Sequence, residues 1–328
     1  MRAPEFWRHD GWLPRLLAPL GAIHEAATAR RVARHGWRAP VPVLCIGNPG
    51  AGGSGKTTVA LDLAARVIAR GCRVAFLTRG YGGRLHGPLL VDPSVHDARD
   101  VGDEALLLSV MSHTYIGADR AATARLAIAE GAQVLVLDDG LQNPSLTKDV
   151  SLLVIDGTAG FGNGRVIPAG PLRESVAAAA SRCTAALLIG PDATGALARL
   201  PPSLPVLRAR LVAEPPPPGP LIAFAGIGRP EKFRETLEAA GAEVLRLHGF
   251  PDHHPYIEAD LRPILAETGV TVVTTPKDAV RLPAALRSRV HVVGVRLEWD
   301  DPSAAGWLLD RLSGEKGQGP GPSYTEHR

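Results

Sequence analysis

The sequence predicts an α/β protein: a mostly parallel β-sheet with helices on both faces, a second and smaller α/β domain, and an amphipathic helix at the N-terminus. Three observations predict this fold. Short apolar runs alternate with helical patterns, a glycine-rich octapeptide follows the first apolar run, and one proline-rich stretch interrupts the pattern. We therefore expect an N-terminal helical region at 1–40, a large domain at 41–213, a linker at 214–220, a smaller domain at 221–313 and a disordered tail at 314–328.

The N-terminal 40 residues predict a helix with one apolar and one basic region. Apolar side chains recur at helical spacing at Leu13, Leu16, Leu17, Leu20 and Ile23, with Trp7 and Trp12 upstream and Arg30, Arg31, Arg34 and Arg38 downstream. This pattern suits a helix in a membrane interface on anionic lipid. It equally suits a helix packed on its own domain, with Pro14 and Pro19 marking bends or starts. Periodicity alone does not decide between the two.

The octapeptide from Gly50 to Thr57 fits the G-x-x-x-x-G-K-[ST] pattern of a phosphate-binding loop. An apolar run at 43–46 precedes it and a helical pattern at 58–69 follows, which is the context that the motif requires. We therefore expect a P-loop NTPase-type core that binds nucleotide through Gly50, Gly52, Gly53, Ser54, Gly55, Lys56, Thr57 and Thr58. Lys56 would reach the β- and γ-phosphates, and the Thr57 hydroxyl would ligate magnesium.

The remaining elements follow from the same alternation of patterns. Strands are expected at 43–46, 73–77, 134–137, 152–155, 185–189 and 206–211, and beyond the linker at 221–224, 243–247, 271–274 and 291–295. Helices are expected at 57–69, 104–111, 120–130, 176–180, 230–240 and 258–267. Gly226 and Gly228 hint at a dinucleotide fingerprint, but Glu231 replaces its third glycine, so a tight strand-to-helix turn explains them better.

Composition excludes several classes of protein. With 45% hydrophobic and 21% charged residues, the 328-residue chain is neither collagenous nor disordered. A net charge of +3, without basic runs interleaved with aromatics, argues against a nucleic-acid partner. Cys45, Cys72 and Cys183 lie too far apart for a disulfide framework or a zinc motif, which favours a reducing cytoplasm. No signal-peptide pattern or long apolar stretch is present, so we expect a chain that neither leaves the cell nor crosses a bilayer.

Several polar groups are candidates for chemistry. The strand predicted at 134–137 ends in Asp138 and Asp139, where a magnesium-binding acid is expected, although an Asp-Gly turn would look alike. Asp103 precedes an apolar helix, so helix capping and catalysis both remain open, with capping favoured. His253 follows Asp252 in a loop and could be an oriented histidine, a metal ligand or part of a turn.

Nine strings in order resemble one family, the membrane-associated tetraacyldisaccharide 4'-kinases of lipid A synthesis. They are PVLCIGNPGAGGSGKT (42–57), TRGYGG (78–83), VGDEAL (101–106), GADR (117–120), DDGLQ (138–142), GNGRVIPAGPLRE (162–174), FAGIG (224–228), FPDHH (250–254) and KDAVRL (277–282). The resemblance implies transfer of the ATP γ-phosphoryl group to the 4'-hydroxyl of a tetraacyldisaccharide 1-phosphate, which gives lipid IVA. The lipid acceptor favours docking of the N-terminal helix on anionic lipid at the cytoplasmic face of the inner membrane, and we expect a monomer that uses ATP and Mg²⁺.

The resemblance also implies roles for individual residues. Asp103 matches a catalytic aspartate that accepts the hydroxyl proton, His253 its dyad partner, and Lys56 the lysine that neutralises charge in the transition state. Metal ligation is implied for Thr57, Asp138, Asp139 and Glu174, and substrate contacts for Asn48, Arg79, Arg120, Gln142 and Arg173. Since Asp103 and His253 fall in different domains, we expect the two domains to close through a hinge at the linker.

Three positions depart from the usual strings of the family: Ala105, Asn143 and Pro276 stand where proline, histidine and glutamate are common. They put local loop shape in doubt, not the reaction. A rival reading is a P-loop GTPase or metallochaperone, which shares the phosphate loop and the sheet. That class would need an Asn-Lys-x-Asp type of guanine motif and often a Cys or His metal cluster, and the sequence shows neither.

Overall fold

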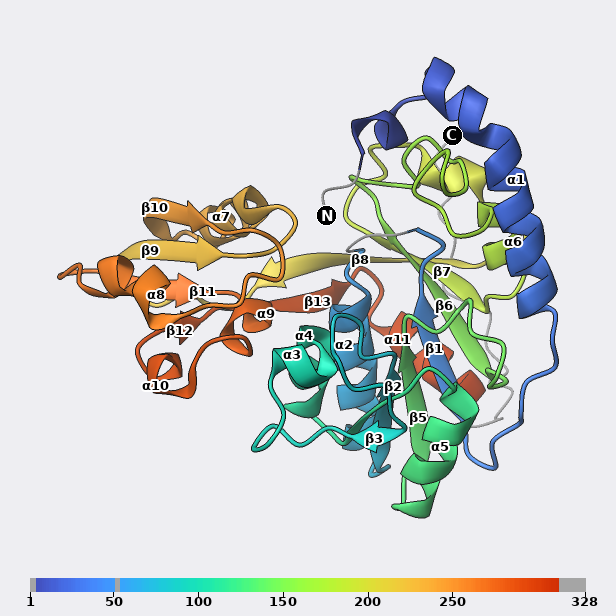
Figure 1. Ribbon diagram of the computed structural model, residues 1–328, viewed down its shortest axis with the longest axis horizontal. Helices are drawn as coiled ribbons and strands as arrows, with labels where there is room; N and C mark the ends of the chain where they lie inside the picture. The colour runs from blue at the N-terminus through green and yellow to red at the C-terminus, as the bar shows by residue number, and fades with distance from the viewer. Residues whose placement is uncertain (1–3, 51–53, 313–328) are drawn as a thin grey trace.

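The computed structural model describes residues 4–50 and 54–312 and consists of two lobes, each built on its own β-sheet (Figure 1). The predicted disordered tail lies outside the described residues. The large lobe contains a nine-stranded sheet in the order β13-β8-β7-β6-β1-β5-β2-β4-β3. Its strands are β1 (Val43–Gly47), β2 (Val74–Thr78), β3 (Leu89–Leu90), β4 (Thr114–Ile116), β5 (Val134–Asp138), β6 (Val150–Asp156), β7 (Ala185–Ile189), β8 (Val206–Ala213) and β13 (Val295–Trp299).

Seven of these strands form a continuous parallel series, and only the edge strands β3 and β13 pair antiparallel. The five strands β1, β2, β5, β6 and β7 are buried along their whole length, as expected for a parallel sheet covered on both faces. β1 lies between β5 and β6. The chain therefore leaves β1 where the strand order changes direction, which is where ligands bind in open α/β folds.

Helices cover both faces of the large sheet. The helices of this lobe are α2 (Lys56–Ala69), α3 (Ala98–Val101), α4 (Asp103–Ser109), α5 (Arg120–Ala129), α6 (Val176–Ala180) and α11 (Ser303–Leu312), together with the 3-10 turn η2 (Ala196–Arg199). α2 and α11 share one core with the sheet, through residues such as Leu63 and Leu308. α5 and α6 share the core on the other face, through residues such as Ala124 and Ala179. This confirms the predicted sheet with helices on both faces.

The small lobe contains a fully parallel four-stranded sheet in the order β10-β9-β11-β12. Its strands are β9 (Pro220–Ala225), β10 (Glu243–Gly249), β11 (Thr271–Thr274) and β12 (His291–Val292), and its helices are α7 (Pro230–Ala239), α8 (Glu258–Leu265), α9 (Pro276–Ala279) and α10 (Ala284–Arg287). Phe233 and Leu237 of α7 pack on one face, and Leu261 and Ile264 of α8 pack in the core on the other.

The extent predicted for the second domain, 221–313, is wrong at its C-terminal end. The predicted strand 291–295 is two strands: β12 pairs with β11 in the small lobe, whereas β13 pairs with β8 in the large sheet. α11 then packs in the core of the large lobe. The chain therefore crosses between the lobes twice, once through the predicted linker and once at Gly294, whose N–H donates to the Glu214 carboxylate at 3.1 Å.

The N-terminal segment forms the 3-10 turn η1 (Glu5–Arg8) and the long helix α1 (Trp12–Val32), which runs along the large lobe (Figure 1). One face packs on the protein: a Cβ at Gly21 would meet the Val166 carbonyl oxygen at 2.9 Å, so glycine permits this close approach. The Glu25 carboxylate accepts from the Ser175 N–H at 3.2 Å. Within the described residues, no helix is long and apolar enough to cross a membrane.

The opposite side of α1 carries an exposed apolar stripe, made of Trp12, Leu16, Leu20 and Ile23, whose exposed fractions are 76%, 66%, 54% and 67%. These residues are spaced four, four and three apart, so they fall on one face of the helix. Arg30 continues that face seven residues further on, and it is exposed. The alternative of a helix packed on its own domain therefore describes one side of α1. The other side is apolar and exposed, and its docking on a membrane stays a prediction.

Candidate active site

The phosphate loop follows β1, as predicted, and leads into α2. Gly55 is the N-cap of α2 with φ of 82°, a conformation that glycine adopts without strain. The Asn48 side chain orders the start of the loop, because its amide donates to the Val154 carbonyl at 2.6 Å while its oxygen accepts from the Gly50 N–H. Thr58 lies in the first turn of α2. Gly52 and Gly53, also predicted to bind nucleotide, lie outside the described residues.

The predicted metal-binding acids lie beside this loop because β5 pairs with β1. Ile46 is in register with Asp138, which places the Asp138 carboxylate next to the start of α2. The Thr57 hydroxyl donates to Asp138 Oδ2 at 2.9 Å. Asp138 Oδ1 is buried and has no hydrogen-bond partner among the residues that the structure describes. Burial, with a smaller contribution from the negative charge of Glu104, raises the pKa of Asp138 to about 7.

Asp139 has a different environment. It adopts a positive φ of 58°, which is uncommon outside glycine and is often found at functional sites. Lys56 Nζ lies 3.7 Å from Asp139 Oδ1, and Arg173 donates to Asp139 Oδ2 at 2.8 Å. Burial acts to raise the pKa of Asp139, but the charges of Lys56 and Arg173 outweigh it, and the pKa lies below its usual value. Asp139 is thus an ionised partner for two cations, although its Oδ1, like Asp138 Oδ1, has no hydrogen-bond partner among the described residues.

A buried hydrogen-bond network connects several predicted substrate and metal residues to each other. The Gln142 amide donates to the Asn48 carbonyl at 3.2 Å and to Glu174 at 2.8 Å, and its oxygen accepts from Arg173 at 3.3 Å. Both oxygens of Glu174 also accept from Arg182 at 2.7 Å. In this arrangement Glu174 is bound by Arg182 and Gln142, so metal ligation by Glu174 stays a prediction.

Two further predicted substrate residues lie near the acids but differ in exposure. Arg120 is buried at the start of α5 and donates to the Gly117 carbonyl. Burial lowers the pKa of Arg120 to about 10, although the negative charge of Asp139 acts in the opposite direction. Arg79 follows β2 and is exposed. Its positive charge also lowers the pKa of Arg120, so the two guanidinium groups lie within electrostatic range of each other.

The second half of the site is formed between the lobes. His253 Nδ1 lies 2.8 Å from Asp103 Oδ2, which joins a small-lobe loop to the first residue of α4. Gly102 is the N-cap of α4, but Asp103 in the first turn also serves the helix start, because its Oδ1 accepts from the Glu104 N–H at 2.9 Å. Asp103 therefore binds the helix terminus through Oδ1 and His253 through Oδ2. The hydrogen bond to Asp103 raises the pKa of His253, although burial opposes this. Burial of Asp103 is outweighed by the bond from His253 and the charge of Lys277, so its pKa is lowered.

Sequence reasoning missed three residues that shape this half of the site. Lys277 Nζ and Arg281 Nε lie 3.9 Å and 3.7 Å from Asp103 Oδ2. Asp278, which is fully buried, holds the surrounding loops, because it accepts from the Gly226 N–H, the Tyr256 hydroxyl and the Arg281 guanidinium at 2.7–2.8 Å. The string KDAVRL contained all three residues. Nothing in that string indicates that it faces the first lobe, so only the fold reveals their role.

The positions that depart from the family strings fit their surroundings. Ala105 is buried in α4. Asn143 donates to the Ala118 carbonyl at 3.1 Å, while its side-chain oxygen accepts from the Ser145 N–H at 3.0 Å. Pro276 occupies the first turn of α9 after the N-cap Thr275, a position that suits proline. Each departure is therefore accommodated locally.

One chain therefore contains both a phosphate loop with its acid and an Asp-His pair between the lobes. Comparisons with known proteins show the family to which this chain belongs. A model of the family described as tetraacyldisaccharide-1-P 4'-kinase matches residues 13–313. The chain belongs to the tetraacyldisaccharide-1-P 4'-kinase family. It is 59% identical to a tetraacyldisaccharide 4'-kinase of Gluconacetobacter diazotrophicus, over 94% of this chain and 98% of that protein. It is 52% identical to the one of Rhodospirillum rubrum, over 95% of this chain and 98% of that protein.

A solved structure of the kinase family supports the fold. The crystal structure of LpxK from Aquifex aeolicus in complex with ATP matches with a TM-score of 0.75 and 26% identity, over 92% of this chain and 99% of that chain. The match spans both lobes, so the α/β architecture with a mostly parallel sheet is that of the kinase family.

Proposed function

We propose that this protein transfers the γ-phosphoryl group of ATP to the 4'-hydroxyl of a tetraacyldisaccharide 1-phosphate, forming lipid IVA in lipid A synthesis. The observation that carries the proposal is that Asp103 and His253 meet at 2.8 Å between the lobes, in a chain of the 4'-kinase family that also carries a phosphate loop. A phosphate loop alone would serve many nucleotide hydrolases. A paired acid and histidine add a general base, which can take the proton from the hydroxyl of an acceptor.

On the acceptor side, Asp103 is the proton acceptor. Its lowered pKa keeps it ionised at neutral pH, and an ionised carboxylate can accept the proton that the hydroxyl loses as it attacks. His253 orients this carboxylate through Nδ1 and, with its raised pKa, carries positive charge over a wider pH range than a free histidine. Lys277 and Arg281 add positive charge within 4 Å of the same oxygen.

On the nucleotide side, the loop amides and the start of α2 bind the phosphates, and Lys56 neutralises charge that develops on the transferred group. Arg173 shares Asp139 with Lys56, which keeps both cations at the phosphate end of the sheet. The transition state of phosphoryl transfer is loose and highly charged, so positioned cations are the main contribution that the protein makes.

A magnesium ion fits the residues beside this loop. Thr57 and Asp138 are the ligand types that Mg²⁺ takes in phosphate-loop enzymes, and the buried Asp138 Oδ1 without a partner offers an unused oxygen. Among residues 4–50 and 54–312, no three His, Cys, Asp or Glu side chains gather into a metal-ligating set. This agrees with Mg²⁺, which is held by one or two protein groups together with substrate phosphates. When bound, the metal would neutralise phosphate charge.

The exposed stripe of α1 would dock the protein on the membrane that holds the lipid acceptor. Trp12, Leu16, Leu20 and Ile23 would enter the interfacial region of the inner membrane at its cytoplasmic face, and Arg30 and its basic neighbours would contact anionic headgroups. The other side of α1 packs on the loop that carries Val166, which continues to Arg173 and Glu174. Docking of α1 would therefore place this loop, and the site beside it, at the lipid surface.

The test is transfer of labelled γ-phosphate to a tetraacyldisaccharide 1-phosphate in mixed micelles, with ATP and GTP compared and magnesium present or removed by a chelator. The expected result is magnesium-dependent labelling of the lipid with ATP. GTP hydrolysis without any labelled lipid would overturn the proposal and make a P-loop GTPase the better reading. Flotation of the protein with anionic and neutral vesicles tests the membrane part separately.

A further inference from the structure

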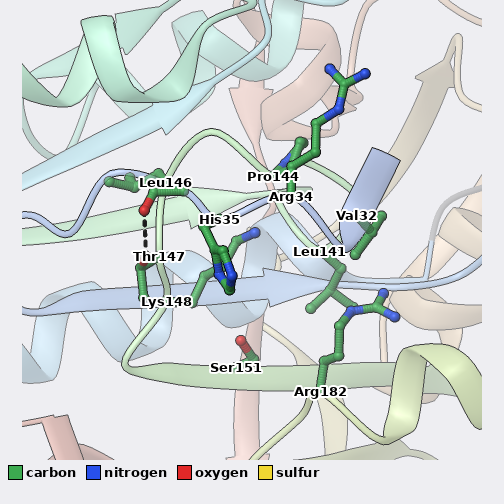
Figure 2. Close-up of a pocket in the computed structure, with 11 residues that line it drawn as sticks. Val32, Arg34, His35, Leu141, Pro144, Leu146, Thr147, Lys148, Ser151 and Arg182 are labelled. Carbon is green, nitrogen blue, oxygen red and sulfur yellow. Dashed lines mark hydrogen bonds between the residues drawn. The ribbon is translucent and has the colours of Figure 1, made fainter. Parts of the chain in front are cut away.

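A cavity of about 250 Å³ lies outside the site described above. It is open to solvent and is bordered by the end of α1 and the residues that follow it, the loop between β5 and β6, the start of β6 and Arg182 after α6 (Figure 2). It is lined by Val32, Arg34, His35, Gly36, Leu141, Pro144, Leu146, Thr147, Lys148, Ser151 and Arg182. None of these residues is predicted to bind nucleotide, metal or acceptor.

The lining of this cavity contains basic side chains but no acidic ones. Four of the eleven residues are basic, namely Arg34, His35, Lys148 and Arg182, and no lining residue is acidic. Of these four, only Arg182 has a carboxylate within ion-pair distance among the described residues, Glu174 at 2.7 Å. Burial lowers the pKa of Lys148, and the charge of Arg182 acts in the same direction. Lys148 donates to the Asn143 carbonyl and has no carboxylate partner among the described residues, and no acidic residue lines the cavity, so the lining carries an excess of positive charge that attracts anions.

Several side chains of the lining are hydrogen-bond donors. Figure 2 shows the His35 ring beside Lys148, with Ser151 on the neighbouring strand. The Arg182 guanidinium lies on the Leu141 side of the cavity, and the Arg34 guanidinium extends away from this group. The Thr147 hydroxyl donates to the Gly36 carbonyl at 3.2 Å, so its proton is already engaged within the lining of the cavity. Lysine, arginine, histidine and a serine hydroxyl are the donors that bind the oxygens of a phosphate group.

We propose that this cavity is a second anion site, which binds the phosphate group of a phosphomonoester or of inorganic phosphate through Lys148, Arg182 and His35. The site connects to the phosphate loop through residues already described. Arg182 binds Glu174, Glu174 binds Gln142, and Gln142 binds the Asn48 carbonyl beside the loop. An anion in the cavity competes with Glu174 for the Arg182 guanidinium. Its binding therefore changes the hydrogen bonds that lead from Arg182 through Glu174 and Gln142 to the Asn48 carbonyl after β1.

The experiment measures equilibrium binding of labelled inorganic phosphate to the full-length protein. A saturating non-hydrolysable ATP analogue occupies the phosphate loop, so that phosphate bound there is not counted. The structure predicts one phosphate per chain, with affinity at least tenfold lower in Lys148→Met, which removes a charged donor but keeps the length of the side chain. His35→Glu lies at an exposed position, so it should not disturb the fold, and it also lowers the affinity for phosphate. Arg208→Met is the control: it removes one positive charge at an exposed position on β8, and it leaves the phosphate affinity unchanged.

A second arm identifies the source of the phosphate group. Vesicles of phosphatidic acid in phosphatidylcholine are added to the complex with labelled phosphate, beside vesicles of phosphatidylcholine alone. Displacement by phosphatidic acid only identifies a lipid headgroup as a ligand, whereas no displacement by either identifies a soluble anion. Equal phosphate binding by wild type, Lys148→Met and His35→Glu, or no binding by wild type, would overturn the proposal. This test reads binding alone, so its failure is distinct from failure of the kinase assay.

Discussion

Replacing His253 with alanine tests whether the contact between the lobes serves chemistry or only stability. The change removes the 2.8 Å bond to Asp103, whose side chain is 4% exposed. Asp103 keeps Lys277 and Arg281 within 4 Å, so it is not left as an unpaired buried charge. A hydrogen bond to a charged group contributes about 1.5–3 kcal/mol, and the 42% exposure of His253 reduces this to about 1 kcal/mol.

The expected loss of activity is much larger than this loss of stability. An acid-base partner contributes about 10²- to 10⁴-fold in rate, which corresponds to about 2.7–5.4 kcal/mol of transition-state stabilisation. The assay is kcat and KM for lipid phosphorylation, measured beside urea unfolding of the same samples. His254→Ala is the matched control, because His254 contacts Asp260 at 2.9 Å within the small lobe. A variant lacking His253 with normal kcat, or an equal loss in His254→Ala, would refute the reasoning.

The contact also has a defined pH dependence. The folded-state pKa of His253 is raised, so its contribution to stability is full below the unfolded value of about 6.5 and is lost as pH rises through the folded value. The pKa of Asp103 is lowered, so its contribution is present above about 3.8 and is lost as pH falls through the folded value. The difference in unfolding free energy between wild type and His253→Ala is therefore largest between about pH 4 and 6.5 and shrinks at alkaline pH. A difference that grows above pH 8 would contradict this sign.

Three further predictions concern other parts of the molecule. Lys56→Met lowers kcat about 10²- to 10³-fold with little change in unfolding by urea, since it removes a cation from the transition state. Leu16→Glu on the exposed stripe of α1 weakens flotation with anionic vesicles about tenfold or more, whereas Ala22→Glu, exposed on another side of the helix, does not. Asp278→Ala lowers the unfolding free energy by about 3–5 kcal/mol, because it removes the nearest carboxylate of the buried Arg281 and leaves the Gly226 N–H and the Tyr256 hydroxyl without their acceptor.

Local sequence patterns predicted most of the large sheet. β1, β5 and β7 begin where their apolar runs predicted, because a parallel strand buried on both faces must be continuously apolar. The octapeptide predicted the loop and the start of α2, and the apolar run before Asp138 predicted an acid beside it. The short strands β3 and β4 were missed, because two or three residues leave no period to read.

Long-range pairing could not be predicted in the same way. β12 and β13 form one apolar stretch in the sequence, and only their partners β11 and β8 show that the chain changes lobes at Gly294. Roles that depend on the facing lobe were missed for the same reason. Lys277 and Arg281 acquire their position near Asp103 only when the lobes are together. The proposed hinge at the linker stays a prediction, now with two crossing segments that would have to bend.

The most direct test of the account is a double-mutant cycle on Asp103 and His253 in the lipid phosphorylation assay. In the proposed function, a carboxylate of the large lobe and an imidazole of the small lobe act as one unit. We therefore expect that Asp103→Asn alone lowers kcat about 10²-fold or more, and that adding His253→Ala lowers it little further. Losses that multiply in the double variant would show two independent residues and would contradict the account.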